Sequence, residues 1–488
     1  MTHKNKSNLT KKLSIGAVAL ASTVVFSCSK VNDQSPYAKL DPNAAFSTPE
    51  RIAKSAVGMY DALQNLEFFG GRVLIYVDQR GLDANKAAYF PNVATFDMLS
   101  NSTTAFNCWS GGYRTINETN FFSQKLKENE SKVSAENAAQ YYAESKFIRS
   151  LAYFYLVNIY AQTYTFSSDA SQPGVPLILT APKDGAEALD PKNKVPRNSV
   201  KEIYDNMIKE LTEAANVLPV KTGDGFYDHA RATKGAAQAL LARIYLYQGN
   251  WAKARDLADS VLLSSAGYAL ENPVTVFASA NYQTSKERIF SVAMNSADNP
   301  NTNNALGQHY GAKGRADISI SKDYLSLPNF DVKTDLRGKS LYNIVLSSDK
   351  KDTTFYTAKF FGTSAFDAWV PVLRLAEVML IKAEALARLN TATADPEAIK
   401  LLNQVRVRAS ATPLAPATAA DLITNILTER RIELAFEGQG VFDFQRTHRD
   451  IPAHAGLAAQ AWNGKYTIFP LPFAEVDRNP NMKQNEGY

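Results

Sequence analysis

Two stretches of the chain, residues 76–107 and 295–324, combine aromatic rings with amide, carboxylate and guanidinium groups. The candidate ligand-binding residues in them are Tyr76, Asp78, Arg80, Asn85, Tyr89, Phe90, Asn304, His309, Tyr310 and Arg315. Flat rings can cover the C–H faces of a sugar, and the polar groups can hydrogen-bond its hydroxyls. This composition favours a saccharide-binding surface. The alternative is that the loop aromatics pin their loops to the scaffold.

No pattern of catalytic residues stands out elsewhere. The five histidines lack the spacing of metal sites, and no nucleophile elbow, phosphate loop or dinucleotide fingerprint is present. Paired carboxylates of the glycosidase type, or a loose calcium site, would leave no spacing signal. We expect a non-enzyme with no catalytic residue, no cofactor and no metal.

The basic charge of the chain is confined to its first residues. The formal net charge is +5, but residues 1–27 hold four lysines and no acid, so the remaining chain has 49 basic and 48 acidic residues. A basic excess that disappears with the leader gives no support to nucleic-acid binding.

The leader has the parts of an export signal. Lysines precede the apolar run Leu13–Phe26, which at about 14 residues is short for a membrane span. The small residue Ser27 is followed by Cys28, which resembles a lipoprotein cleavage box. We therefore expect a signal peptide over 1–27, lipidation of Cys28, and a polar tether over 28–40.

Helical patterns position the two loop regions. Helices are expected within 47–66, 107–265 and 371–447, among them the runs Ala135–Tyr160 and Val200–Val217. Irregular segments with short strands are expected within 68–107 and 267–370, with a strand at 287–292 and an extended segment at 356–361. The segments 174–179 and 466–472 are also expected to be extended. Small residues at helical spacing in 231–263 resemble a tetratricopeptide helix pair, with looser copies elsewhere. The fold expected is mainly α, with a large irregular half.

The segment Leu422–Thr447 carries charges on an apolar helical stripe. Charges there are costly unless paired, so Arg430, Arg431, Glu433 and Glu437 are expected to form a partly buried ion-pair network. Arg430 and Glu437 are predicted to be partners within it. Gly438 would let the backbone leave the helix.

Several separated motifs together resemble one known family. They are Trp109-x3-Tyr113-x2-Ile116-Asn117-x2-Asn120, Arg231–Arg243 with its Tyr-Gln-Gly-Asn-Trp turn, Val372–Leu380, Glu429–Gly438, and Phe469–Tyr488. This set is similar to the SusD/RagB family of nutrient-binding outer-membrane lipoproteins. The positions that carry the resemblance are Arg374, Glu377, Arg430, Arg431, Glu433, Glu437, Asn479, Pro480 and Tyr488.

The resemblance implies a SusD-like domain over 41–488 that ends in the family motif 466–488. It implies a lipid anchor in the outer membrane, facing the exterior, and a SusC-like TonB-dependent β-barrel transporter as partner. It also implies capture of oligosaccharide or polysaccharide without catalysis. Two alternatives stay open: a family member that captures peptide or another nutrient, and a scaffold that binds only proteins.

Overall fold

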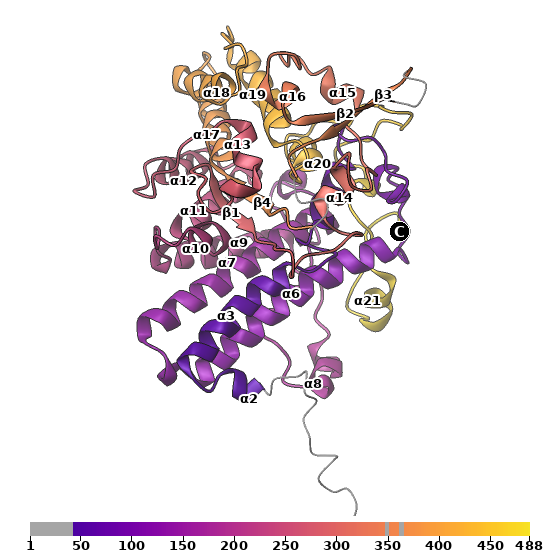
Figure 1. Ribbon diagram of the computed structural model, residues 1–488. Helices are drawn as coiled ribbons and strands as arrows, with labels where there is room; N and C mark the ends of the chain where they lie inside the picture. Colours follow the sequence, from indigo (N-terminus) through magenta and orange to yellow (C-terminus); the bar gives the residue numbers. More distant parts are fainter. Residues whose placement is uncertain (1–41, 347–350, 361–365) are drawn as a thin grey trace, which may run out of the picture.

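Helices dominate the computed structural model, which describes residues 42–346, 351–360 and 366–488 (Figure 1). The leader, Cys28 and the tether fall outside these residues. The long helices are α3 (Pro49–Leu63), α6 (Thr103–Glu128), α7 (Ala135–Tyr160), α9 (Val200–Val217), α11 (Lys234–Tyr247), α12 (Trp251–Leu262), α17 (Leu375–Leu389), α18 (Pro396–Arg408) and α19 (Ala419–Leu434). The expected mainly α fold is confirmed. Within the described ranges, no helix is both long enough and apolar enough to cross a membrane.

Short elements connect the long helices. The short helices are α2 (Pro42–Ala45), α4 (Arg72–Asp78), α5 (Pro91–Ala94), α8 (Gly185–Leu189), α10 (Gly225–Ala230), α13 (Pro273–Phe277), α14 (Leu306–Tyr310), α15 (Lys322–Leu325), α16 (Leu336–Lys339), α20 (Gly440–Arg446) and α21 (Phe473–Arg478). The strands are β1 (Arg288–Val292), β2 (Tyr342–Leu346), β3 (Thr353–Thr357) and β4 (Val370–Arg374). Helix α4 corrects the expectation that 68–107 is irregular throughout.

Local signals account for many helix boundaries. Ser199 begins α9 with a capping box, in which its hydroxyl accepts from the Glu202 backbone N–H and the Glu202 carboxylate accepts from the Ser199 N–H. The Thr48 hydroxyl caps α3 in the same way, by accepting from the Arg51 N–H. These side chains satisfy backbone donors that the helix leaves free at its start, which is why the boundaries are readable in the sequence.

The helices stack in sequence order, and the stack closes over a long insertion. Helix α7 packs on α6 and α9, and α11 packs on α9 and α12. Although the insertion 263–374 separates them in sequence, α12 and α17 pack directly against each other. The tetratricopeptide-like pairs are therefore interrupted along the chain but continuous in space.

The insertion contains two small antiparallel sheets, β1 with β4 and β2 with β3. Strand β1 confirms the strand expected at 287–292. An extended segment was expected at 356–361, and strand β3 instead ends at Thr357, while Phe361 lies outside the described residues. The segment 174–179, expected to be extended, belongs to neither sheet.

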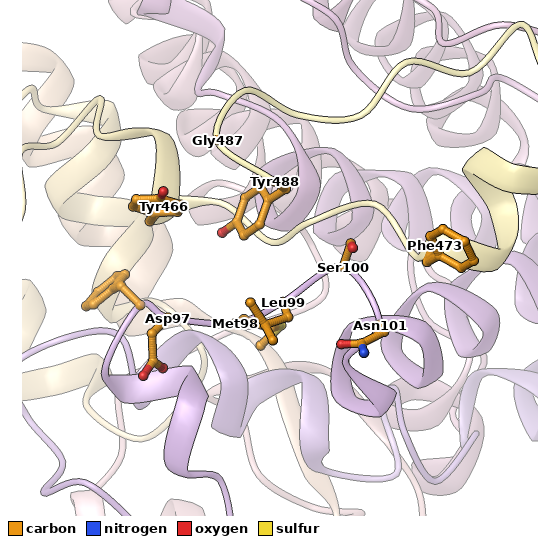
Figure 2. Close-up of a pocket in the computed structure, with 10 residues that line it drawn as sticks. Asp97, Met98, Leu99, Ser100, Asn101, Tyr466, Phe473, Gly487 and Tyr488 are labelled. Atoms are coloured by element: carbon orange, nitrogen blue, oxygen red, sulfur yellow. The ribbon is translucent and has the colours of Figure 1, made fainter.

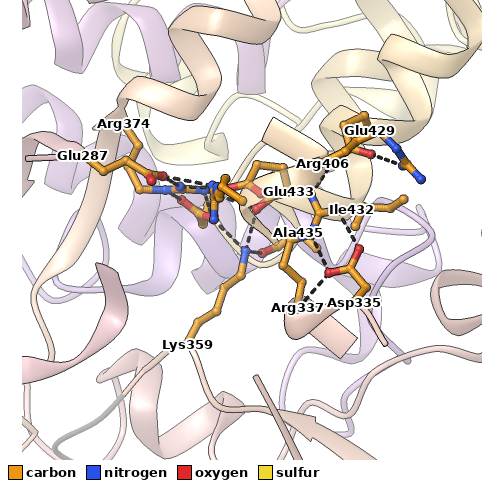
Figure 3. Close-up of polar contacts among 12 residues, drawn as sticks. Glu287, Asp335, Arg337, Lys359, Arg374, Arg406, Glu429, Ile432, Glu433 and Ala435 are labelled. Atoms are coloured by element: carbon orange, nitrogen blue, oxygen red, sulfur yellow. Dashed lines mark hydrogen bonds and ion pairs between the residues drawn. The ribbon is translucent and has the colours of Figure 1, made fainter. Parts of the chain in front are cut away.

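A charged cluster fastens this insertion to the helices (Figure 3). We call it the Arg374 network; its members are Glu287, Asp335, Arg337, Lys359, Arg374, Arg406, Arg408, Glu429, Glu433 and Glu437. Arg374 Nε lies 2.7 Å from Glu437 Oε2, and its Nη1 lies 2.9 Å from Glu433 Oε1. Burial raises the pKa of Glu433, but Arg408 and Arg374 outweigh it and hold that pKa well below its usual range. Five cations thus face five carboxylates in the interior.

The predicted partnership of Arg430 with Glu437 is wrong. Helix α19 ends at Leu434, so Glu437 leaves the helical face that carries Arg430. Arg430 Nε donates to Asp443 Oδ2 at 2.9 Å, whereas Glu437 pairs with Arg374 and Lys359. The expected burial of these charges is confirmed, but their partners lie on other elements.

The remaining motif charges also pair at long range. Glu377 lies 2.6 Å from Arg243 Nη2, and Arg431 Nη2 lies 2.6 Å from Asp83 Oδ1. Each pair joins segments far apart in the sequence. The motif therefore holds the scaffold together.

Candidate functional site

An open cleft lies between the irregular loop after α5 and the last residues of the chain (Figure 2). We call it the Tyr466 cleft; it is lined by Phe96, Asp97, Met98, Leu99, Ser100, Asn101, Tyr466, Phe473, Gly487 and Tyr488. Its volume is about 720 Å³, which is within the range of small-molecule sites. A segment of one or two sugar rings would fit such a space.

Side-chain amides hold the final segment in place behind the cleft. Gln484 Oε1 accepts from the Leu471 backbone N–H at 2.8 Å, and Gln484 Nε2 donates to the Leu471 carbonyl at 2.7 Å. Asn485 Nδ2 donates to the carbonyls of Tyr160 and Phe469, both at 2.8 Å. These bonds replace a regular sheet or helix, so an irregular segment keeps a defined path.

A glycine lets this path run close to the cleft wall. Gly487 has a φ of +94°, a left-handed conformation that favours glycine. A Cβ at this position would lie 2.7 Å from Lys465 Cδ and 3.1 Å from Tyr466 Cε1. The close approach brings Tyr488 against Tyr466, with ring centroids 5.4 Å apart in an edge-to-face arrangement.

The cleft presents aromatic and aliphatic surface to solvent. Phe473 is 58% exposed, Leu99 64% and Tyr466 39%. Figure 2 shows Tyr466 and Phe473 on the C-terminal segment, and Asp97 and Asn101 on the loop across the cleft. Exposed rings in one cleft with an amide and a carboxylate can contact the C–H face of a sugar and its hydroxyls.

A second cleft borders α21, the short helix that carries Phe473. It has a volume of about 740 Å³ and is lined in part by Trp109, Arg114, Glu475 and Arg478. Phe473 and Glu475 both belong to α21 but line different clefts. Helix α21 is thus a ridge between the two, and a polymer could cross it.

The ten residues proposed from the sequence fall into two groups. The buried group is Tyr76, Asp78, Arg80, Phe90, Asn304, His309 and Tyr310. Asn85 is half-buried, while Tyr89 and Arg315 reach the surface. The alternative reading, in which most loop aromatics pin the loops, fits the buried group. Direct ligand contact stays a prediction only for the residues with exposed atoms.

Several of the buried residues join the two loop regions to each other. Tyr310 Oη donates to Asp78 Oδ2 at 2.9 Å, and Asn85 Nδ2 donates to Ser319 Oγ at 2.9 Å. Burial raises the pKa of Asp78 well above its usual range, against the hydrogen bonds from Tyr310 and Gly438. Regions more than 200 residues apart in the chain thus form one surface.

On that surface Tyr89 is flanked by two arginines. Arg315 Cζ lies 4.6 Å from the centroid of the Tyr89 ring, and Arg72 Nη2 donates to Tyr89 Oη at 2.9 Å. Arg315 also donates to Asn303 Oδ1 at 2.9 Å. The ring is 38% exposed, so this Tyr89 surface is a smaller candidate contact for a ligand.

Sequence reasoning missed the residues that line the Tyr466 cleft. It assigned Tyr466, Phe473 and Tyr488 to an extended segment and a family motif, without a ligand. An aromatic residue in an irregular segment was the only available signal, and the same signal marks the buried Phe90 and Tyr310. Among the described residues, no group of three or more His, Cys, Asp or Glu side chains is arranged to hold a metal ion.

Comparison with known proteins places the chain. Residues 346–488 match the model of the SusD family, and residues 32–246 match a model described as starch-binding and associating with the outer membrane. A SusD-like protein of Formosa agariphila is 26% identical, with 98% of this chain and 100% of that protein covered. Another SusD-like protein, from Bacteroides ovatus, is 23% identical over 74% of this chain and 69% of its own length.

Solved structures agree with these matches. A SusD superfamily protein from Bacteroides fragilis superposes with a TM-score of 0.78 at 27% identity, covering 90% of this chain and 99% of that one. A Bacteroides vulgatus protein of the same superfamily gives 0.77 at 25% identity, with the same coverage. The family models matched by residues 32–246 and 346–488 agree with the superposition, which covers 90% of the chain. The chain belongs to the SusD/RagB family.

Proposed function

We propose that this protein binds a glycan in the Tyr466 cleft and passes it to a SusC-like TonB-dependent transporter, without catalysing a reaction. The observation that carries the proposal is the set of exposed rings, Tyr466 and Phe473, that line one open cleft together with Asp97 and Asn101. A soluble protein gains nothing in stability by exposing such rings, so their exposure points to a ligand.

The descriptions of related proteins also support glycan binding. One matching family model is described as starch-binding, and a Bacteroides vulgatus structure at 25% identity, TM-score 0.75, is described as a sugar binding protein. The same family description supports association with the outer membrane. Lipidation at Cys28 would provide the anchor and display the protein on the cell exterior.

Binding is tested by calorimetry with the purified protein and a panel of oligosaccharides. We expect saturable binding that Tyr466→Ala and Phe473→Ala each weaken by about 1–3 kcal/mol, the typical range for a buried aromatic contact. Phe226→Ala is the matched control, because it removes a ring that is 45% exposed on α10, outside the cleft. Peptide binding with no glycan binding would favour the peptide-capturing alternative and refute the proposal.

Delivery and the absence of catalysis need separate tests. The lipidated protein, extracted from membranes in mild detergent, is expected to carry a SusC-like barrel with it. Incubation of bound oligosaccharide with the protein is expected to leave its chain length unchanged by chromatography. A barrel recovered without any glycan binding would support the scaffold that binds only proteins.

A further inference from the structure

Among the residues that the structure describes, one buried arginine has no anionic partner, and it lies directly behind the Tyr466 cleft. The Arg80 side chain is 1% exposed, and among the described residues neither of its terminal nitrogens has a hydrogen-bond partner. Its Cζ lies 5.6 Å from the centroid of the Phe96 ring and 5.1 Å from that of Phe469. Ring faces compensate a buried cation only in part, so this position is costly for the folded state.

The lack of a partner for either terminal nitrogen distinguishes Arg80 from the other fully buried arginines of the described residues. Carboxylates pair with Arg243, Arg337, Arg374, Arg406 and Arg430. Arg288 lacks such a pair but donates to the Val276 carbonyl and to Ser291 Oγ. Nη1 of Arg243 and of Arg430 also lacks a partner, but each of these other guanidinium groups has at least one acceptor, whereas both terminal nitrogens of Arg80 lack one among the described residues.

The charge of Arg80 is close enough to act on the cleft. Phe96, which it contacts, is part of the cleft wall, and so is Tyr488. Burial raises the pKa of Tyr488 to about 12, against the lowering effect of the Arg80 charge, so the two groups interact electrostatically. Burial lowers the pKa of Arg80 to about 10, and it remains a cation at neutral pH. In a poorly screened interior, this positive field extends to the cleft surface.

A second cation stands at the rim. Lys465 is exposed, and its Nζ lies 5.2 Å from the centroid of the Tyr466 ring. The acidic residue in the lining is Asp97, whose carboxylate already accepts a hydrogen bond from the Thr95 hydroxyl. The cleft therefore combines ring faces with two nearby cations, Arg80 and Lys465, and with the exposed carboxylate of Asp97, whose charge the bond from Thr95 does not remove.

We propose that the Tyr466 cleft selects acidic saccharides, whose carboxylate or sulfate group lies against Phe96 and Tyr488, between Arg80 and Lys465. This inference rests on the proposed function, glycan binding in the same cleft, and specifies its substrate class. An anion at this position would supply the counter-charge that Arg80 lacks. The free protein bears the cost of this unpaired buried cation, and binding of the anion would relieve it.

The test compares three oligosaccharides of matched length by calorimetry: an oligogalacturonate, a sulfated carrageenan oligosaccharide and an uncharged galactan oligosaccharide. We expect at least one acidic probe to bind about tenfold more tightly than the neutral one, and this preference to shrink at high salt. Preference for the uronate or for the sulfate ester identifies the source of the anion, and either one supports the proposal.

Two variants and one control locate the effect. Lys465→Gln should weaken acidic binding about threefold more than neutral binding, a typical value for the loss of an exposed charge. Lys483→Gln, on the same segment but outside the cleft lining, should change neither. Arg80→Met should abolish the preference for acidic probes; if that variant fails to fold, the Lys465→Gln result and the salt dependence decide.

The results that would refute the preference for acidic saccharides differ from those that would refute glycan binding. If neutral and acidic probes bind equally and Tyr466→Ala abolishes both, glycan binding stands and the acidic preference is refuted. If acidic probes bind but Lys465→Gln and salt have no effect, the proposed electrostatic origin is refuted. If none of a broad panel of glycans binds, both proposals fail.

Discussion

The Arg374 network and the Tyr466 cleft differ in whether their buried charges are paired. In the network, five cations and five carboxylates, all buried except the partly buried Arg408, pair across β4, α16, α18 and α19. At the cleft, no carboxylate of the described part of the chain pairs with the buried Arg80, and apolar rings are exposed to solvent. Matched charge and buried apolar surface stabilise a fold, whereas unmatched charge and exposed rings cost stability. The difference separates the part of the molecule that holds the shape from the part that a ligand would complete.

The largest effect is expected from breaking the network at its centre. Arg374→Ala should lower the free energy of unfolding by about 3–5 kcal/mol, because it removes one cationic partner from each of the buried carboxylates Glu287, Glu433 and Glu437. Urea unfolding measures the change, and Arg255→Ala, which breaks an exposed pair with Asp256, should cost less than about 1 kcal/mol. Equal losses for the two variants would contradict a structural role for the network.

Acid should weaken the ion pairs that Glu384 makes with Arg446 and Arg388, outside the Arg374 network. Burial raises the pKa of Glu384, but Arg446 and Arg388 outweigh it and lower that pKa to about 2, from an ordinary value of 4.5. A depressed carboxyl pKa contributes stability above its unfolded value and loses it as pH falls, so about 3 kcal/mol should disappear between roughly pH 4.5 and pH 2.

The measurement is the free energy of unfolding at a series of pH values. Glu384→Gln should be less stable than the wild type at pH 7 and show a shallower decline below pH 4.5. Glu128→Gln, which alters an exposed pair with Lys125, is the control and should follow the wild-type curve. Parallel curves for Glu384→Gln and the wild type would refute this contribution.

A glycine exchange should affect the cleft more than the fold. Gly487→Ala should cost about 1–2 kcal/mol of stability from its left-handed backbone and also weaken glycan binding, because its Cβ would displace Lys465 or Tyr466. Gly223→Ala shares the strain, with a φ of +83°, but has open space around it. Calorimetry should therefore show unchanged binding for Gly223→Ala; similar binding losses in both variants would contradict the role of Gly487.

The smallest effect is expected from removing the anchor. Cys28→Ala should leave thermal unfolding and glycan affinity unchanged, because we expect the residue to belong to a polar tether ahead of the domain. Membrane fractionation should find the variant in the soluble fraction. Loss of folding in this variant would contradict the tether interpretation of 28–40.

Local chemistry explains which parts of the fold could be predicted. The expected run Ala135–Tyr160 is α7, and the expected Val200–Val217 is α9, because caps and residue propensities act over a few positions. Strand β1 was predicted for the same reason. The partners of Glu437 were not predictable, since Lys359 and Arg374 are more than 60 residues away in the chain.

By itself, the sequence determined the helices, their boundaries, the family resemblance and the need for buried charges to be paired. Only the tertiary structure decided which charges pair and which loop aromatics meet solvent. Tyr310 and Tyr466 are equally suited to a sugar, yet one is covered by Phe360 and Phe436 and the other faces an open cleft. Exposure is a property of what packs on top of a residue, and that neighbour comes from a distant part of the chain.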